Sequence, residues 1–212
     1  FDQQAQRVAN TLEHIHKAES RTLGSTPRRI SVILQNQSAE SNVFVTILPR
    51  RSEFYVMPPQ DYNFLGTNDW LDQLASHEYR HMVQYQHATR AFNRVIYYLF
   101  GATGLTGMAH AAAPNWFWEG DAVVTETAFT RSGRGRIPNF NLVFRTNFLS
   151  GRTFNYHKQY LGSYKHNIPD YYVFGYNMVS YLRKRTNDPE IWGKITARSW
   201  SVPFIPFAFS NA

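Results

Sequence analysis

The spacing of hydrophobic residues predicts one helix at the start of the chain and short strands after it. Four apolar residues recur at helical spacing and predict an amphipathic helix over residues 2–19: Ala5, Val8, Leu12 and Ile15. Apolar and polar residues then alternate in three short runs, at 29–35, 42–48 and 53–57. Such alternation indicates strands. We expect the three strands to form a small antiparallel sheet.

A second helical pattern, over residues 69–88, contains the sequence His77-Glu78-Tyr79-Arg80-His81. Its two histidines are four residues apart and therefore project from one face of the helix, one turn apart. This H-E-x-x-H spacing allows two imidazoles to bind one zinc ion. Glu78 lies about 100° further round the helix, where it can reach an attacking water without ligating the metal. The pattern predicts a Zn²⁺ site with Glu78 as the general base.

A catalytic zinc ion needs a third protein ligand and an open coordination position. The best candidate is Glu119, in the sequence Trp-Phe-Trp-Glu-Gly-Asp-Ala at 116–122. This W-x-x-E-G-x-A sequence, after H-E-x-x-H, resembles the gluzincin metallopeptidases, especially the aminopeptidase-N-like and glycyl-aminopeptidase-like branches. The resemblance implies that Glu119 is the third zinc ligand, together with His77 and His81.

The resemblance also implies a tyrosine that stabilises the transition state, three residues before a glycine. Tyr172, before Gly175, occupies that position, and Tyr171 and Tyr176 remain alternatives. The chain lacks the G-x-M-E-N sequence with which aminopeptidases of this group bind the free amine of the substrate. The resemblance therefore implies a zinc peptidase without implying aminopeptidase specificity, and leaves endo- or exo-cleavage open.

A ligand imidazole usually donates its second ring N–H to a carboxylate or carbonyl group. Glu126 is seven residues after Glu119 and so lies on the same helix face, which makes it a better partner than Asp121. The remaining histidines have no ligand spacing relative to the H-E-x-x-H pair. We expect them to lie outside the metal site: His14, His16, His87, His110, His157 and His166.

The chain contains no cysteine, which excludes disulfides, thiolate zinc sites and cysteine nucleophiles. Its net charge of +7 comes entirely from residues 127–169, which hold seven basic residues and no acidic one. Because this segment lies between two predicted site motifs, we expect it to form a wall or lid of the cleft and to favour acidic partners. A solvated loop is the alternative. Basic and aromatic residues alternate here as in single-strand nucleic-acid binders, but no recognisable nucleic-acid-binding sequence is present, so we expect no specific nucleic-acid partner.

Residues 95–118 contain no charged side chain and are numerous enough to cross a membrane. Three regularly spaced glycines and Pro114 interrupt this run. A single crossing would also place His81 and Glu119 on opposite sides of the bilayer, where they could not share a metal ion. We therefore expect a buried helix and turn, with peripheral membrane contact through 95–118 as the alternative.

Together these patterns predict an α+β, zincin-like catalytic domain that is part of a longer protein. Residues 1–68 would form a lobe of one helix and the antiparallel sheet, and residues 69–212 a mainly helical zinc-site lobe. The predicted function is a zinc-dependent peptidase acting on peptides or proteins. The alternative is an inactive zincin-like binding module whose segment 127–169 contacts phospholipid, lipopolysaccharide or nucleic acid. The cysteine-free composition is compatible with an exported protein, and the oligomeric state is open.

Overall fold

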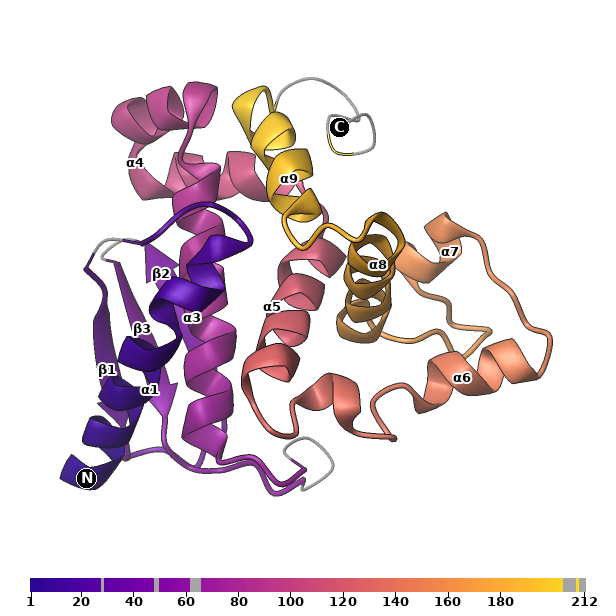
Figure 1. Cartoon of the computed structure of the whole chain (residues 1–212), viewed down its shortest axis with the longest axis horizontal. Coiled ribbons are helices and arrows are strands. Elements are labelled where there is room, and N and C mark those ends of the chain that lie inside the picture. Colours follow the sequence, from indigo (N-terminus) through magenta and orange to yellow (C-terminus); the bar gives the residue numbers. More distant parts are fainter. Residues whose placement is uncertain (28, 48–49, 62–65, 204–208, 210–212) are drawn as a thin grey trace.

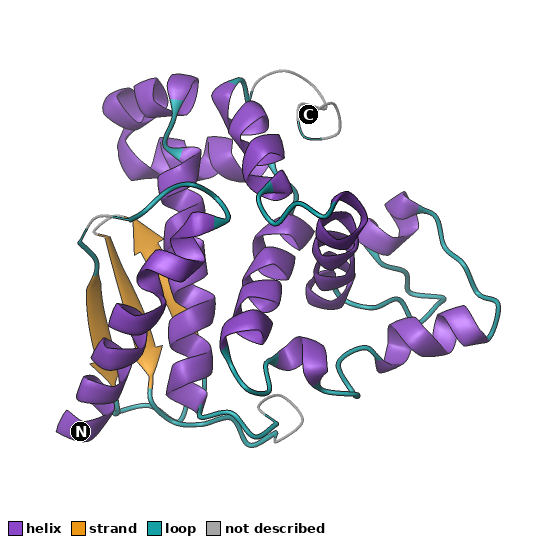
Figure 2. Cartoon of the chain, viewed as in Figure 1, coloured by secondary structure: helices purple, strands orange, loops and turns teal. Residues whose placement is uncertain are grey.

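The computed structural model describes residues 1–27, 29–47, 50–61, 66–203 and 209. A three-stranded sheet lies at one side of the molecule and helices form the rest, which confirms the predicted α+β class (Figure 2). The elements of the first part are α1 (Asp2–Arg21), β1 (Ser31–Gln35), β2 (Val43–Ile47) and β3 (Arg50–Tyr55). Those that follow are α3 (Trp70–Ala88), α4 (Ala91–Ala112), α5 (Asn115–Phe129), the 3₁₀ turn η1 (Arg134–Arg136), α6 (Leu142–Leu149), α7 (Tyr156–Leu161), α8 (Tyr171–Thr186) and α9 (Ile191–Ser201).

The two helices predicted from hydrophobic spacing are present close to their expected bounds. In α1, Val8 and Ile15 are buried, as the amphipathic pattern requires. Helix α3 starts directly after Asp69, whose side chain accepts a hydrogen bond from the backbone N–H of Leu71 at 2.9 Å. Such a cap satisfies one of the backbone donors that a helix start leaves unpaired.

The prediction of a purely antiparallel sheet is wrong. The strand order is β1-β3-β2: β2 and β3 pair antiparallel, whereas β1 pairs with β3 in parallel. The third strand thus lies between the first two, and alternation in the sequence defines strands without defining their order. The third strand also starts earlier than predicted, and Leu48 lies outside the described residues. Strand β2 is an edge strand of this sheet.

Helix α3 lies in the middle of the molecule (Figure 1). The sheet and α1 are on one side of it, and α5 is on the other, with α8 beyond α5. Hydrophobic cores fill both sides of α3. The first includes Val8, Phe54 and Trp70, and the second is a cluster of aromatic residues around Phe117 and Trp200. Because α3 is packed on both sides, its His-Glu-His residues are held on a rigid element.

Helices α5 and α8 cross in direct backbone contact. A Cβ atom on Gly120 would collide with the backbone of Gly175, and one on Gly175 would collide with the carbonyl of Trp116. Glycine at both positions therefore allows the close approach. This crossing fixes Glu119, next to Gly120, relative to Tyr172, one turn before Gly175.

Helix α4 is kinked at Gly101, whose φ of 65° and ψ of −159° are not helical. After the kink, Ala102, Leu105 and Ala109 are buried. Before it, Leu99 and Phe100 are 68% and 66% exposed, so the prediction of a buried helix is wrong for this half. None of the described helices has the length and apolarity needed to cross a membrane.

The segment between α5 and α8 contains η1, α6 and α7. Helices α6 and α7 have no buried residue. They lie on the far side of α8 from the sheet (Figure 1). The basic segment therefore consists of one turn packed against α5 and an exposed helical arm.

Candidate metal centre

The structure brings together the three residues predicted as metal ligands. The Nε2 atoms of His77 and His81 lie 3.2 Å apart, and Oε2 of Glu119 lies 3.2 Å from the first and 3.4 Å from the second. A tetrahedral ion with bonds of about 2.1 Å separates its ligand atoms by about 3.4 Å. The three atoms therefore have the spacing of one face of a zinc tetrahedron. Within the described ranges no second group of histidines and carboxylates could hold a metal ion in this way.

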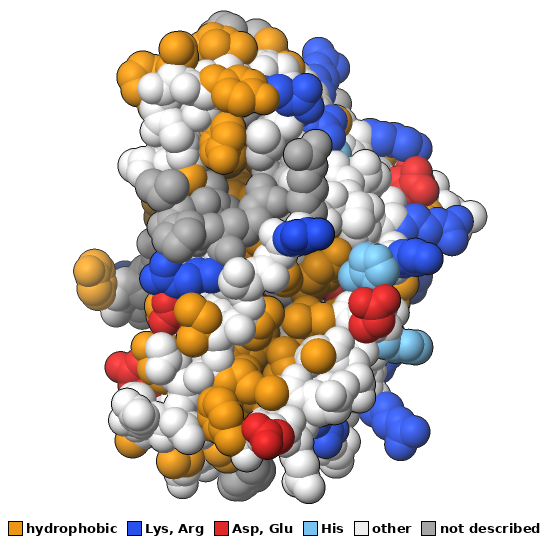
Figure 3. Space-filling model, turned by 90° about the vertical axis from the view of Figure 1, so that its left-hand side faces the viewer, with side chains coloured by type: hydrophobic (Ala, Val, Ile, Leu, Met, Phe, Trp, Pro, Cys, Tyr) orange, Lys and Arg blue, Asp and Glu red, His pale blue; other side chains and the backbone are white. Residues whose placement is uncertain are grey.

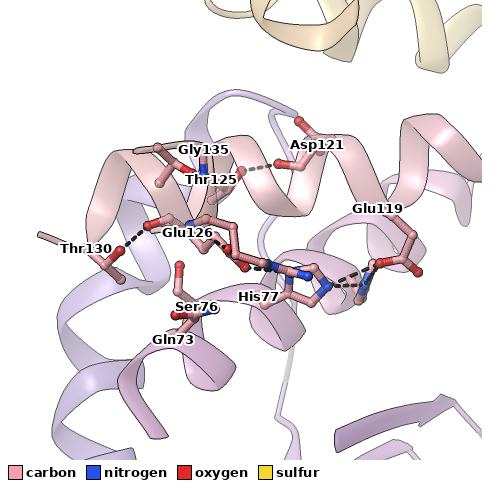
Figure 4. A network of polar contacts seen from close by, with 12 residues as sticks. Gln73, Ser76, His77, Glu119, Asp121, Thr125, Glu126, Thr130 and Gly135 are labelled. Atoms are coloured by element: carbon pink, nitrogen blue, oxygen red, sulfur yellow. Dashed lines mark hydrogen bonds and ion pairs between the residues drawn. The ribbon is translucent and has the colours of Figure 1, made fainter. Parts of the chain in front are cut away.

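The two candidate histidine ligands come from α3, and Glu119 comes from α5. Between them α4 leads the chain away from α3 and back, so that α5 lies against α3. Figure 4 shows that Glu119 and Glu126, both on α5, point to His77 on α3. The 37 residues between His81 and Glu119 are thus compatible with one shared site.

Glu126 orients the first imidazole, as predicted from its helix face. Its Oε2 lies 2.9 Å from Nδ1 of His77. If the proton is on Nδ1, the lone pair of Nε2 faces Glu119, which is the form that binds a metal. Arg134 in turn donates to both oxygens of Glu126, at 2.7 and 2.8 Å. Burial opposes ionisation of Glu126, but the charge and hydrogen bonds of Arg134 outweigh it and lower the pKa of Glu126 to about 2.

The second imidazole is oriented by Gln84, which the sequence interpretation missed. Nδ1 of His81 lies 2.8 Å from Oε1 of Gln84. The amide NH₂ of Gln84 donates to the Trp118 carbonyl at 2.9 Å and to Asp121 at 3.0 Å. These two acceptors fix the orientation of the amide, so its oxygen faces the imidazole. Gln84 is one turn after His81 on the same helix, which was the only clue in the sequence.

Asp121 has a different role from the one considered for it. Its carboxylate accepts two hydrogen bonds from Arg80, at 2.6 and 3.0 Å, and one from Arg183 at 2.9 Å. All its partners lie on α3 or α8, so this buried carboxylate joins both helices to α5. It is linked to the candidate ligand His81 through Gln84.

The electrostatics of the ligand atoms reflect their mutual contact. Burial disfavours a charged His81, but the carboxylate of Glu119 outweighs it and raises the pKa of His81 to about 9. Burial likewise disfavours a charged Glu119, yet the two imidazoles hold the pKa of this carboxyl far below its usual range. Such a site favours binding of a cation at the point where the three ligand atoms meet.

A cleft of about 460 Å³ opens over these ligands, and its lining includes Glu78 and Tyr172. Glu78 is 8% exposed, and burial raises the pKa of its carboxyl. Burial also raises the pKa of Tyr172, so its hydroxyl keeps its proton. Tyr171 and Tyr176 do not line the cleft. Tyr172 is therefore the tyrosine that faces the candidate site, 6.4 Å from the His77 ring between centroids.

The basic segment contributes one residue, Arg134, to the lining of this cleft. Its guanidinium lies 5.0 Å from the centre of the Tyr172 ring and is almost fully buried. Of the segment predicted to form a wall or lid, only Arg134 thus lines the cleft, while Arg145, Arg152 and Lys165 are exposed and do not line it. Only the charge of Arg134 was evident from the sequence, because its contact with His77 spans 57 residues.

One histidine predicted to lie outside the site is part of the cleft. His110 lines it, stacks on Trp118 with ring centroids 4.5 Å apart, and lies 3.1 Å from the hydroxyl of Tyr85. Tyr85 also lines the cleft and is one turn after His81, so helical spacing could have identified it. His87 lies outside the cleft, as predicted, and its Nε2 contacts the Gly193 carbonyl at 3.0 Å.

Comparisons with protein-family models, with curated proteins and with solved structures give no match for this chain. The interpretation of the site therefore rests on its residues and their geometry.

Proposed function

We propose that this chain is a zinc-dependent peptidase that uses Glu78 as its general base and Tyr172 to stabilise the oxyanion. The observation that carries the proposal is the triangle of His77 Nε2, His81 Nε2 and Glu119 Oε2, with sides of 3.2 to 3.4 Å, at the base of a cleft. Two imidazoles and one carboxylate are a donor set typical of catalytic zinc.

A bound ion would polarise the scissile carbonyl and acidify a water molecule. Glu78 would accept a proton from the attacking water and pass it to the leaving amine nitrogen. The hydroxyl of Tyr172 would donate a hydrogen bond to the oxyanion. The rigid packing of α3, α5 and α8 would keep these groups in position during the reaction.

A peptide substrate is supported by the position of β2. Ser41, Asn42, Val43, Phe44 and Val45 line the same cleft as the candidate ligands. As an edge strand, β2 can pair with an extended peptide through main-chain hydrogen bonds while side chains fill alternate pockets. This arrangement would lay the peptide across the cleft beside Glu78.

The test combines metal analysis with hydrolysis of a fluorescently labelled unfolded protein. The wild-type chain should contain about one zinc per molecule, and His77→Ala should lose it. Glu78→Gln should keep the zinc and lose hydrolysis, on the order of a thousandfold or more, because it removes the base and keeps the shape of the side chain. Glu13→Gln, an exposed glutamate on α1, is the matched control and should behave like the wild type.

Two outcomes would contradict the proposal. Equal zinc content in the wild type and in His77→Ala would show that the triangle does not bind the metal. Full zinc content without Glu78-dependent hydrolysis of any protein or peptide tested would favour the inactive binding module.

A further inference from the structure

The first half of α4, residues 91–100, exposes a cluster of large apolar side chains that we call the α4 cap. Six of its residues are at least 38% exposed, and Tyr98 is 78% exposed: Phe92, Val95, Tyr97, Tyr98, Leu99 and Phe100. Figure 3 shows hydrophobic side chains gathered at the α4 end of the molecule, with basic side chains beside them. Such a concentration of exposed apolar groups usually marks an interaction site.

The shape of the α4 cap suits insertion into a fluid layer such as the surface of a lipid bilayer. Successive helix residues lie about 100° apart, and all four residues of the last turn before the kink are exposed: Tyr97, Tyr98, Leu99 and Phe100. The end of this half-helix is therefore exposed around most of its axis. The kink at Gly101 follows directly. Beyond it, the second half of α4 is anchored by buried residues and by its packing against α9. The cap is thus a projecting tip on a fixed base.

Helix α4 and the residues just before it carry basic but no acidic side chains. Between Glu78 and Glu119 the sequence has no acidic residue, while Arg90 and Arg94 stand at the start of α4. Arg94 is exposed, and Arg198 is exposed on α9, the helix that packs against α4. A basic residue near an anionic lipid surface contributes about 1 kcal/mol of attraction. The cap therefore combines apolar insertion with attraction to negative charge.

The side chains of the cap are those found at membrane interfaces. Phe92, Tyr97, Tyr98 and Phe100 are aromatic, and tyrosine rings favour the boundary between headgroups and acyl chains. We propose that the α4 cap docks onto an anionic lipid bilayer by shallow insertion at its tip. A second copy of the chain fits less well, because a symmetric contact would pair this patch with an identical one that also carries Arg94 and no acidic residue.

The proposal can be tested by sedimentation with vesicles and two matched double variants. Leu99→Ser/Phe100→Ser changes the cap. Phe148→Ser/Leu149→Ser changes the same residue types on α6, where they are 70% and 80% exposed. Wild-type protein should bind phosphatidylcholine vesicles that contain phosphatidylglycerol, and bind pure phosphatidylcholine more weakly. The cap variant should lose on the order of tenfold or more in partition coefficient, because two large apolar side chains no longer insert. The α6 variant should stay within about twofold.

A charge variant separates the electrostatic contribution. Arg94→Glu should weaken binding to the anionic vesicles, and the effect should shrink as salt is added, since exposed charges are screened. Glu78→Gln should bind vesicles like the wild type, so failure of the proposed peptidase function and failure of docking can be told apart.

Three results would overturn the proposal. Wild-type protein that does not bind either vesicle lacks the docking function. Equal losses in the cap and α6 variants would show that binding is not specific to α4. A cap variant that changes from dimer to monomer in light scattering, with unchanged vesicle binding, would identify a second copy as the occupant.

Discussion

Helices α4 and α5 follow one another in the sequence and are both rich in apolar residues, yet they differ sharply in burial. Ten of the 15 residues of α5 are buried, against five of the 22 residues of α4. Helix α5 lies between α3 and α8 and contacts both. The first half of α4 projects beyond its neighbours. Apolar composition gives a helix the tendency to bury its surface, and the position of neighbouring elements decides whether it does so.

The largest expected effect compares one substitution in the two helices. Phe117 on α5 is fully buried against Trp192 and Trp200, whereas Phe100 on α4 is 66% exposed. Phe117→Ala should lower the free energy of unfolding by about 3–5 kcal/mol, because it removes buried area and leaves a cavity. Phe100→Ala should change it by no more than about 0.5 kcal/mol. Denaturant unfolding measures both, and similar losses would mean that the α4 cap is buried in solution.

The next effect concerns glycines in closely packed and in open positions. Gly175→Ala should lower the free energy of unfolding by about 1–3 kcal/mol or more, because the new Cβ forces α8 away from α5. Gly107→Ala, on α4, meets nothing within 4 Å and should raise stability by up to about 1 kcal/mol through helix propensity. Thermal and denaturant unfolding would check the opposite signs. A stabilising Gly175→Ala would contradict the backbone contact between α5 and α8.

The comparison of α4 with α5 also shows which residues of the candidate site could be predicted from the sequence. His77, His81 and Glu126 follow helical spacing, so periodicity alone places them relative to their neighbours on one helix. Glu119 depended on a resemblance, because no local pattern relates α5 to α3. Gln84 has a local spacing but an unremarkable residue type. Arg134 reaches Glu126 from a turn whose conformation no periodic pattern encodes.

The two wrong predictions, of the strand order and of the burial of α4, have the same physical origin as these omissions. Alternation predicted three strands, but the order β1-β3-β2 depends on which strand edges meet after the chain has folded. The absence of charged residues predicted burial for 95–118, but burial of α4 depends on neighbouring elements, and four of its five buried residues follow the kink. Local patterns thus predicted the helices and strands and which face of each is apolar. They did not predict which elements, distant in sequence, contact one another.

A third prediction concerns the pH dependence of stability. Helix α5 carries buried acidic residues, among them Glu126, whereas α4 carries no acidic residue. The folded state keeps Glu126 ionised down to about pH 2, whereas its unperturbed pKa is 4.5. Between these values the unfolded chain binds more protons, so the free energy of unfolding falls as the pH decreases. This group contributes a slope of up to about 1.4 kcal/mol per pH unit. Glu126→Gln should therefore show a shallower loss of stability below pH 4.5, measured by denaturant unfolding at a series of pH values.

Glu13→Gln is the control for this experiment, because Glu13 is exposed on α1 and should leave the slope unchanged. Chelator in all samples keeps metal binding out of the comparison. An unchanged slope in Glu126→Gln would contradict the buried contact with Arg134.

The smallest expected effect concerns the arm of α6 and α7, which resembles the first half of α4 in exposing large apolar side chains and having no acid. Arg145, Arg152 and Lys165 are exposed there, so their charges act on association and hardly on stability. Replacing all three by glutamate should raise KM for an acidic peptide severalfold at low salt. The penalty should shrink as the salt concentration approaches physiological values, where the Debye length is about 8 Å.

The control variant replaces three exposed basic residues outside the segment by glutamate: Lys17, Arg21 and Lys184. It changes the net charge of the protein by the same amount as the arm variant. It therefore distinguishes attraction by the arm from attraction by the total charge. If the arm attracts the substrate, only the arm variant should show the salt-dependent rise in KM, and kcat for a small neutral peptide should stay unchanged in both. Equal effects of the two triple variants would mean that the overall charge of the protein, and not the position of the arm, attracts acidic substrates. The arm would then be a solvated surface, and Arg134, held against α5 by Glu126, would be the single basic residue of the segment that serves the site.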